Sequence, residues 1–205
     1  MSDAGEWAPD WDRVLEKGER LLWTGRPEHG RRLWQVVGQE PVWYAGGAIA
    51  IAAMWGGVLF IREERADMII LFSALTAIVL LAALFMVLQR QFVLSHLYYA
   101  ITDRRAIICR RGRDVLLRDG LYFLFFAHDT DWTYPILPGR SLASVRVGTL
   151  LSENAVQPFG AGLVHSGWPV LRGRTVTPAL FENLPDARAV QRMLREAAAR
   201  RAGQG

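Results

Sequence analysis

The sequence predicts an α+β membrane protein, in which a two-helix transmembrane hairpin precedes a small β-barrel or sandwich closed by a C-terminal amphipathic helix. Three observations predict this class. Two apolar runs without a charged residue, 42–61 and 68–88, lie close together. Short alternating segments follow over residues 96–182, and a helical pattern over residues 184–202 ends the sequence. Strands that are grouped together and followed by a helix are typical of the α+β class.

The composition is compatible with this class and excludes others. The chain has 205 residues, enough for one domain with an added element or for two small domains. With 51% hydrophobic residues, it is too apolar for a disordered protein. Its single cysteine, Cys109, excludes an internal disulfide and a zinc site of the Cys₂His₂ type. The net charge of +4 is a mild basic excess that membrane proteins share with nucleic-acid-binding proteins, so it does not indicate nucleic acid.

The two apolar runs have the length of membrane spans. They hold 20 and 21 residues, and a helix rising ~1.5 Å per residue makes each about 30 Å long, the thickness of a bilayer's hydrocarbon core. The alternative is a pair of buried helices in a soluble protein, which is less favoured because uncharged runs of this length are typical of spans. The link between the runs, residues 62–67, is so short that the helices must form an antiparallel hairpin.

The arginines predict how the hairpin is oriented. The link carries Arg62 and Arg65, whereas the outer flanks carry six arginines, namely Arg26, Arg31, Arg32, Arg90, Arg104 and Arg105. Basic residues are enriched at the cytoplasmic ends of spans, so both termini are expected in the cytoplasm and the link outside. The residues before the first run show no signal-peptide pattern. The sequence therefore predicts a multi-pass inner-membrane protein.

Small residues on the first span predict a helix-packing face. Spacings of four, three and four place on one helical face Gly46, Ala50, Ala53 and Gly57. Small side chains let helices approach closely in lipid. We expect this face to pack within the hairpin against Ser73 and Ala77 of the second span, and the alternative is dimerisation between chains. Neither span contains a charged residue or a histidine, which argues against a transporter or channel.

Residues 96–113, with the sequence HLYYAITDRRAIICRRGR, predict a β-hairpin after the second span. Alternation places Tyr99 and Ile101 on one face of the first strand, and Ile107 and Cys109 on one face of the second strand. Asp103 lies between the strands, and Asp favours turns because its side chain bonds nearby backbone N–H groups. Cys109 is expected to be a buried, inert thiol.

Further strands are predicted downstream. The segment RSLASVRV places on one face Ala143, Val145 and Val147. The segment LYFLFF, residues 121–126, has no alternation. It is either a strand buried on both faces or an element packed against the membrane surface. The strand order over residues 114–140 stays open.

The end of the chain predicts a helix over residues 184–202. Asn183 is the expected N-cap, and Pro185 is tolerated in the first turn. An apolar stripe at helical spacing consists of Val190, Met193, Leu194 and Ala197. This stripe is expected to close the open end of the barrel or sandwich.

Several segments together resemble a bacterial family of membrane-anchored PH-like domain proteins. These are GERLLWTGRPE at 18–28, the two spans, YYAITDRRAII at 98–108 and FENLPDARAVQRMLREA at 181–197. The family pattern reads Gly-Glu, hydrophobic residues, Trp-x-Gly-x-Pro, a helical hairpin and Tyr-x-x-Thr-Asp-x-Arg. The resemblance covers most of the chain. It implies a PH-like fold on the cytoplasmic side and does not imply an activity, and the segment 114–140 departs from the pattern by being longer and more apolar.

On this basis the chain divides into three parts. Residues 1–41 form an N-terminal cytoplasmic segment, residues 42–88 the transmembrane hairpin, and residues 89–205 the PH-like domain with its C-terminal helix. The N-terminal segment is expected to pack on the domain or to lie in the membrane interface, with Trp23 and Trp34 as anchors.

The sequence offers little for catalysis or cofactor binding. His128, Asp129 and Asp131 form a conceivable metal trio, but side chains so close together on a loop are commonly turn and capping groups. The chain has no Gly-x-Ser-x-Gly pattern, no phosphate-binding loop and no dinucleotide fingerprint. We therefore expect no enzymatic activity, cofactor, metal, small-molecule substrate or nucleic-acid partner.

An arginine cluster follows the second span closely enough to lie near the inner leaflet. It consists of Arg104, Arg105, Arg110, Arg111 and Arg113. That leaflet is anionic, and each arginine near it contributes on the order of 1 kcal/mol to binding. The cluster is a candidate contact for lipid headgroups. The alternative, which we favour, is that these arginines only follow the orientation rule.

The function predicted from the sequence is that of a non-enzymatic inner-membrane protein that presents a PH-like interaction domain to the cytoplasm. It would act as a scaffold or assembly factor that binds a protein partner or itself, since tethering raises the local concentration of the domain at the membrane. The alternative function is a module that senses anionic lipid through the arginine-rich hairpin.

Overall fold

The structure, a computed structural model, describes residues 9–38, 40–58, 65–112, 119–126, 133–139, 141–151, 163 and 176–203. The chain begins with a short helix, α1 (Trp11–Val14), and a strand, β1 (Leu21–Gly25). Two long helices follow, α2 (Glu40–Val58) and α3 (Arg65–His96). The remaining elements are β2 (Leu97–Thr102), β3 (Arg105–Arg110), β4 (Gly120–Phe125), β5 (Ile136–Leu137), β6 (Ala143–Leu151), β7 (Val176–Leu184) and α4 (Ala187–Ala202).

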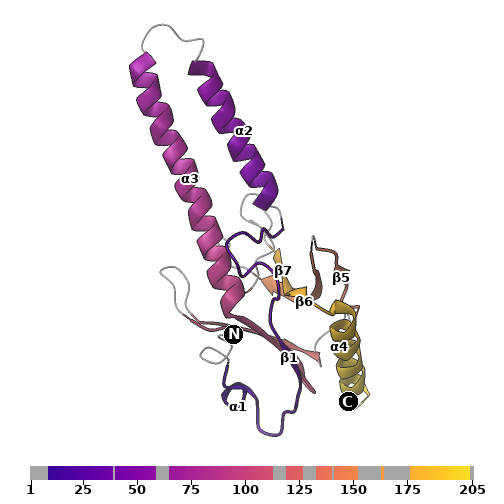
Figure 1. Cartoon of the computed structure of the whole chain (residues 1–205). Helices are drawn as coiled ribbons and strands as arrows, with labels where there is room; N and C mark the ends of the chain where they lie inside the picture. Colours follow the sequence, from indigo (N-terminus) through magenta and orange to yellow (C-terminus); the bar gives the residue numbers. More distant parts are fainter. Residues whose placement is uncertain are drawn as a thin grey trace.

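The two long helices stand away from the strands as an antiparallel pair (Figure 1). Both are long and apolar enough to cross a membrane, and only 6% of the most apolar window of α2 and 0% of that of α3 is buried. A core helix of a soluble protein would be mostly buried, and these two helices are not. Their surroundings must accept large apolar side chains, because Ile49, Ile78 and Leu81 are between 61% and 70% exposed.

Helix α3 is longer than the predicted span and has two roles. The run 68–88 lies inside a helix of 32 residues, which is about 48 Å long at ~1.5 Å per residue. The last turns continue past the apolar run and bury Val93 and Leu94 in the core of the strand domain. Strand β2 begins at Leu97, directly after His96. The helix therefore enters the sheet without a linker.

The predicted small-residue face does not form the contact between the two helices. All four of its residues are exposed, namely Gly46, Ala50, Ala53 and Gly57. A Cβ added at Gly46 or Gly57 would meet nothing within 4 Å. The expected counterface, Ser73 and Ala77, is exposed as well. The prediction that this face packs within the hairpin is therefore wrong.

The helices meet through a neighbouring face of α2. A Cβ at Gly47 would lie 3.6 Å from Val79, and the Trp55 indole N–H donates to the Thr76 hydroxyl at 3.0 Å. A hydrogen bond between helices satisfies polar groups that an apolar environment would otherwise leave without partners. This bond and the Gly47–Val79 contact lie on the face of α2 that meets α3.

The strands form two antiparallel sheets. The first has the order β1-β2-β3-β4 and the second the order β5-β6-β7. The predicted hairpin is confirmed as β2 and β3, with Tyr99 opposite Ile108. Residues 121–125 of the LYFLFF segment lie in strand β4, which pairs with β3. The strand is not buried on both faces, because Leu121 and Phe125 are exposed. The expected barrel is not closed, because no described strand of one sheet pairs with a strand of the other.

The strand before the helices belongs to the same sheet as the strands after them. β1 pairs with β2, with Leu21 opposite Thr102 and Gly25 opposite Tyr99. The helical hairpin is therefore inserted between two adjacent strands of one sheet. Trp23 in β1 stacks on Phe181 of β7 at 5.9 Å between ring centroids, so this expected anchor packs on the domain.

One core joins both sheets and the C-terminal helix. Fully buried residues from all three are Tyr99 of β2, Val145 of β6, Phe181 of β7 and Leu194 of α4. Helix α4 contacts strands of both sheets, and its predicted apolar stripe is confirmed, with Val190 and Ala197 buried and Met193 packed against the core. The predicted inward face of β6 is confirmed by the burial of Val145 and Val147.

Helix α4 begins three residues later than predicted. Its N-cap is Asp186, whose Oδ1 accepts from the Ala189 N–H at 2.9 Å. Asn183 instead has a φ of 51°, a left-handed conformation that Asn tolerates better than most residues. Its side-chain amide donates to the His29 carbonyl at 3.2 Å, and its own carbonyl accepts from the Glu28 N–H at 3.0 Å. Asn183 therefore fastens the N-terminal loop to β7.

Candidate functional site at the base of the helical hairpin

The arginines of the predicted headgroup cluster lie in different surroundings. Arg105 and Arg110 are 3% and 1% exposed, so these two are not available to a lipid headgroup. Arg104 and Arg111 are partly exposed, and Arg113 lies outside the described residues. Arg104 lies in the β2–β3 turn, whereas Arg111 lies at the other end of that hairpin, beside the end of α3. The described arginines therefore do not form one surface.

Arg105 is held inside the domain by the N-terminal segment. Its guanidinium donates to both carboxylate oxygens of Glu19, Nε to Oε1 at 2.9 Å and Nη2 to Oε2 at 2.8 Å. It also donates to the Val14 carbonyl at 3.2 Å and lies 4.2 Å from the centre of the Phe123 ring. The Thr102 hydroxyl donates to Glu19 Oε1 at 2.7 Å. This buried, bidentate ion pair, the Glu19–Arg105 clamp, joins the segment before the helices to the turn after them.

The residues that carry the family resemblance thus meet in space. Gly18 and Glu19 precede β1, and the Thr-Asp-x-Arg pattern ends β2 and begins β3. The Asp103 carboxylate accepts from the Arg20 N–H at 2.9 Å, and the Asp103 N–H donates to the Arg20 carbonyl at 3.0 Å. Gly18 has a φ of 77°, a conformation that favours glycine. The side chains of Thr102, Asp103 and Arg105 therefore bind other parts of the same domain.

The clamp determines the ionisation of Glu19. Burial raises the pKa of its carboxyl group, but hydrogen bonds from Arg105, the Glu16 N–H and the Thr102 hydroxyl, together with the charge of Arg105, outweigh burial. The net pKa lies below the usual value for Glu. Glu19 is therefore a carboxylate at neutral pH.

A second buried ion pair lies at the base of the helical hairpin. Arg90 of α3 is 0% exposed, and its Nη1 donates to Oε2 of Glu40, the first residue of α2, which is 2% exposed. Its Nη2 donates to the carbonyls of Arg32 at 3.1 Å and Leu33 at 2.6 Å. Glu40 Oε2 also accepts from the Val37 N–H at 3.3 Å. One guanidinium, in the Glu40–Arg90 clamp, therefore joins both helices and the loop before them.

In the sequence, Arg90 counts only as one of the arginines that predict the orientation of the hairpin, and Glu40 does not stand out. A simple pattern would have found the pair. The two residues have opposite charges, and each lies two positions outside an apolar run, at the same end of an antiparallel hairpin. Antiparallel helices bring such positions to one level, and a buried charge needs a partner.

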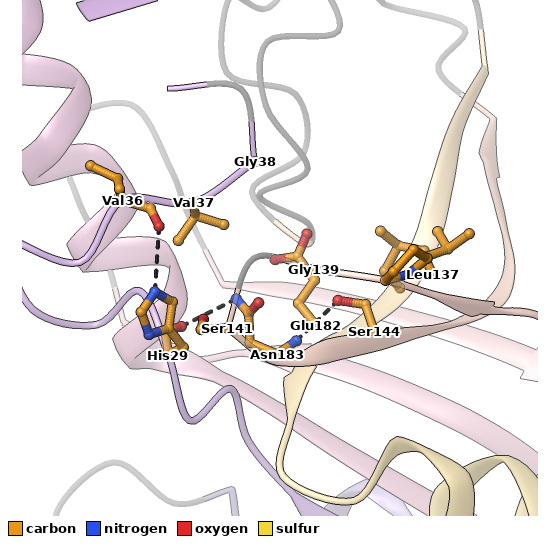
Figure 2. A pocket seen from close by; sticks show the side chains of 12 residues that line it. His29, Val36, Val37, Gly38, Leu137, Gly139, Ser141, Ser144, Glu182 and Asn183 are labelled. Carbon is orange, nitrogen blue, oxygen red and sulfur yellow. Dashed lines mark hydrogen bonds between the residues drawn. The ribbon is translucent and has the colours of Figure 1, made fainter. Parts of the chain in front are cut away.

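A pocket of about 240 Å³ opens beside the loop before α2. Figure 2 shows the His29 ring directed at the Val36 carbonyl, 3.4 Å away. It also shows Asn183 between the His29 carbonyl and the Ser144 hydroxyl, which accepts from the Asn183 N–H at 3.1 Å. These bonds join the N-terminal loop to β6 and β7. Of these four residues, only Asn183 was singled out from the sequence, as a helix cap, because the contacts join segments that are distant along the chain.

Metal-binding and nucleophilic groups are sparse in the described part of the chain. No group of three or more His, Cys, Asp or Glu side chains there is placed to hold a metal ion. The trio of His128, Asp129 and Asp131 lies outside the described residues. Cys109 is buried, as predicted. Burial raises the pKa of its thiol, and nearby Asp119 raises it further against the opposing effect of neighbouring arginines, so the thiol is protonated at neutral pH.

The arrangement at the hairpin base is suited to positioning one element against another. Its strongest polar interaction is the buried Glu40–Arg90 clamp, and the buried Glu19–Arg105 clamp fastens the far end of the β1–β2 pair. The sequence matches no protein-family model, no curated protein and no solved structure. The geometry of the two clamps and the helices therefore carries the functional proposal.

Replacing Glu19 by glutamine is expected to remove a pH-dependent part of the stability. The folded-state pKa of Glu19 is lowered, so its contribution is present above the unfolded value of 4.5 and is lost as the pH falls through the folded value. At neutral pH, E19Q should lower the free energy of unfolding by about 3 kcal/mol, because it removes the buried carboxylate from Arg105 and leaves only the more exposed Glu16 carboxylate, 3.4 Å away. The difference in free energy of unfolding between E19Q and the wild type should decrease steadily as the pH falls into the acid range. Thermal unfolding of the full chain in mild detergent, followed by tryptophan fluorescence, measures both effects.

The matched control is Glu196→Gln, which changes an exposed carboxylate on α4. The free energy of unfolding of E196Q should differ little from that of the wild type, both at neutral pH and in acid. A gap between wild type and E19Q that stayed constant into the acid range would contradict the role assigned to Glu19.

Replacing Arg90 by methionine is expected to loosen the base of the hairpin. Removing one partner of a buried pair costs about 3–5 kcal/mol, because Glu40 keeps an uncompensated charge. The double variant R90M/E40L should recover a large share of that loss. Recovery should be incomplete, because the carbonyls of Arg32 and Leu33 also lose their donor. Unfolding midpoints in mild detergent compare the stability of the wild type, R90M and R90M/E40L. Arg192→Met, on the exposed face of α4, is the control. A double variant less stable than R90M would refute this account of the pair.

Proposed function

We propose that this chain is a non-enzymatic, multi-pass inner-membrane protein that presents a PH-like interaction domain to the cytoplasm, where it acts as a scaffold or assembly factor for a protein partner or a second copy of itself. The observation that carries the proposal is the unbroken passage from α3 into β2. A helix that runs from an apolar segment directly into a sheet sets the position of the domain at the membrane.

The N-terminal side of the domain is fastened as well. β1 pairs with β2, Glu19 holds Arg105, and Asn183 holds the loop before α2. A domain fixed on both sides of its membrane anchor offers a constant surface to a partner. Such preorganisation lowers the entropy lost on binding, which favours a role in recognition.

The PH-like part of the proposal is supported by the arrangement of the strands. A four-stranded and a three-stranded antiparallel sheet share one core with a C-terminal helix. This arrangement is compatible with the fold that the family resemblance implies. The helical hairpin then occupies the connection between the first two strands of the domain.

Strand β4 offers a candidate surface for the partner. Among the described strands it lies at an edge of the first sheet, and it exposes Leu121 at 47% and Phe125 at 39%. An edge strand has backbone groups that can pair with a further strand, and apolar side chains beside it add contact area. A strand of another protein, or β4 of a second copy, is suited to this edge.

The alternative function, lipid sensing through the β2–β3 hairpin, is less favoured. The burial of Arg105 and Arg110 leaves fewer guanidinium groups to meet headgroups. Any test of lipid binding needs the full chain, because residues 90–205 alone lack β1 and leave Arg105 without Glu19.

A reporter enzyme that is active only outside the cytoplasm tests the proposed topology. It should be active when inserted between Glu63 and Glu64, in the link outside the described residues, and inactive when fused to the C-terminus. The reason is the excess of arginines on the outer flanks of the spans. The reverse pattern of activity would overturn the proposed orientation and with it the cytoplasmic domain.

A photo-crosslinking residue at Leu121 of the full chain in native membranes tests the partner surface. We expect a discrete crosslinked product, because Leu121 is an exposed apolar side chain on an edge strand. A product of twice the chain's mass would identify a second copy, and any other discrete mass a different protein. The same residue placed at Arg192, on the exposed face of α4, is the control. The absence of a discrete product from both Leu121 and Phe125 would remove β4 as the interface.

A further inference from the structure

The loop before α2 exposes large apolar side chains at the base of the helical hairpin. Trp34 is 74% exposed and Leu33 45% exposed. The exposed apolar surface resumes on the first turn of α2, where Val42 is 67% and Trp43 42% exposed. Exposed patches of large apolar side chains are typical of surfaces that bind a protein or a membrane.

This loop is held in place by polar contacts. The Arg90 guanidinium binds the carbonyls of Arg32 and Leu33 at 3.1 and 2.6 Å. The Gln35 side-chain oxygen accepts from the N–H groups of Gly30 at 3.0 Å and Arg32 at 3.2 Å. The Gln35 N–H, after Trp34, donates to the Arg32 carbonyl at 3.1 Å. Backbone groups on both sides of Trp34 are therefore bonded, and the exposure of Leu33 and Trp34 is a feature of the folded loop.

The loop lies at the level where the apolar helices end. Arg90, which binds it, follows the apolar run 68–88 by two residues, and Glu40 precedes the run 42–61 by two residues. Figure 1 shows the chain before α2 curling beside the lower part of α3, between the helices and the sheets. If the two helices cross a bilayer, this level is that of the lipid headgroups.

Positive charge is concentrated on the same loop. Arg31 is partly buried, and burial lowers its pKa, as do the charges of Arg26 and Arg32, whereas Glu28 opposes the shift. Glu28 lies 3.5 Å from Arg31 as its ion-pair partner. The Arg32 guanidinium lies 5.7 Å from the centre of the Trp34 ring. Three guanidinium groups that affect one another thus share this loop with one carboxylate, and an anion placed there would relieve their repulsion.

We propose that this loop, through Arg26, Arg31, Arg32, Leu33 and Trp34, is a binding surface for the phosphate headgroups of anionic phospholipids in the inner leaflet. The arginines contact the phosphates, while Leu33 and Trp34 enter the boundary between headgroups and acyl chains. The inference rests on the proposed membrane insertion of α2 and α3. It places lipid recognition on the loop before the helices, away from the β2–β3 hairpin.

The full chain in nanodiscs with one chain per disc tests this surface. Cys109 is the only cysteine, so a C109S/L33C chain carries a nitroxide label at one position and keeps Trp34. In discs of phosphatidylcholine with phosphatidylglycerol, the label should be protected from a water-soluble nickel complex and accessible to oxygen. In discs of phosphatidylcholine alone, or with R31Q/R32Q added, that protection should be largely lost. The matched charge control is R200Q/R201Q on the exposed last turn of α4, which should leave the protection unchanged.

Each other outcome has a defined meaning. A label that is open to the nickel complex in anionic discs, in a chain that is integrated in them, overturns this surface and leaves the proposed function intact. Protection that is equal in neutral and anionic discs shows apolar anchoring alone and overturns the role of the arginines. Protection found only in discs with two chains identifies a second copy as the occupant and also overturns the proposal. A chain that fails to enter discs, or that alkaline carbonate strips from native membranes, refutes the proposed function itself.

Discussion

The buried guanidinium of Arg90 is the interaction on which the arrangement of helices and strands depends. It binds the carboxylate of Glu40 and the carbonyls of Arg32 and Leu33, so the last turns of α3, the first residue of α2 and the loop before α2 meet at one group. A buried charge is costly unless it is paired, so these partners cannot separate without a large loss of stability. The pair joins α2 and α3 at the domain end of the helical hairpin. It thereby fixes the loop before α2 relative to the end of α3 that leads into β2.

The Glu19–Arg105 clamp repeats this principle at the far end of the β1–β2 pair. Its partners are 86 residues apart in the sequence, a separation that would make closure slow and costly for a flexible chain. The helical hairpin lowers that cost, because its two ends already lie together at Glu40 and Arg90. Only the short segments between β1 and α2, and between Arg90 and β2, remain to be ordered. Insertion of the helices between two strands of one sheet is therefore compatible with efficient folding.

Local patterns in the sequence predicted the elements, and long-range contacts decided their details. The β2–β3 hairpin and the apolar stripe of α4 follow from periodicity alone and are confirmed. The N-cap of α4 was misplaced because Asn183 is used for a tertiary contact with His29, and Asp186 caps the helix instead. The face of α2 was misassigned because the spacing of small residues does not reveal the Trp55–Thr76 hydrogen bond, which lies on the face that meets α3. The burial of Arg105 could not be seen in a local pattern, since its partner Glu19 lies on the other side of both spans.

The arginines near the spans therefore belong to two physical classes that composition alone does not separate. Arg90 and Arg105 are neutralised by buried carboxylates and add little to the field at the surface. If both are left out, the flanks keep Arg26, Arg31, Arg32 and Arg104, four arginines against two in the link. The expected orientation thus survives the removal of the buried charges. Three of these four precede α2 rather than follow α3, so under the expected orientation most of this charge lies on the segment before α2, whose loop Arg90 holds.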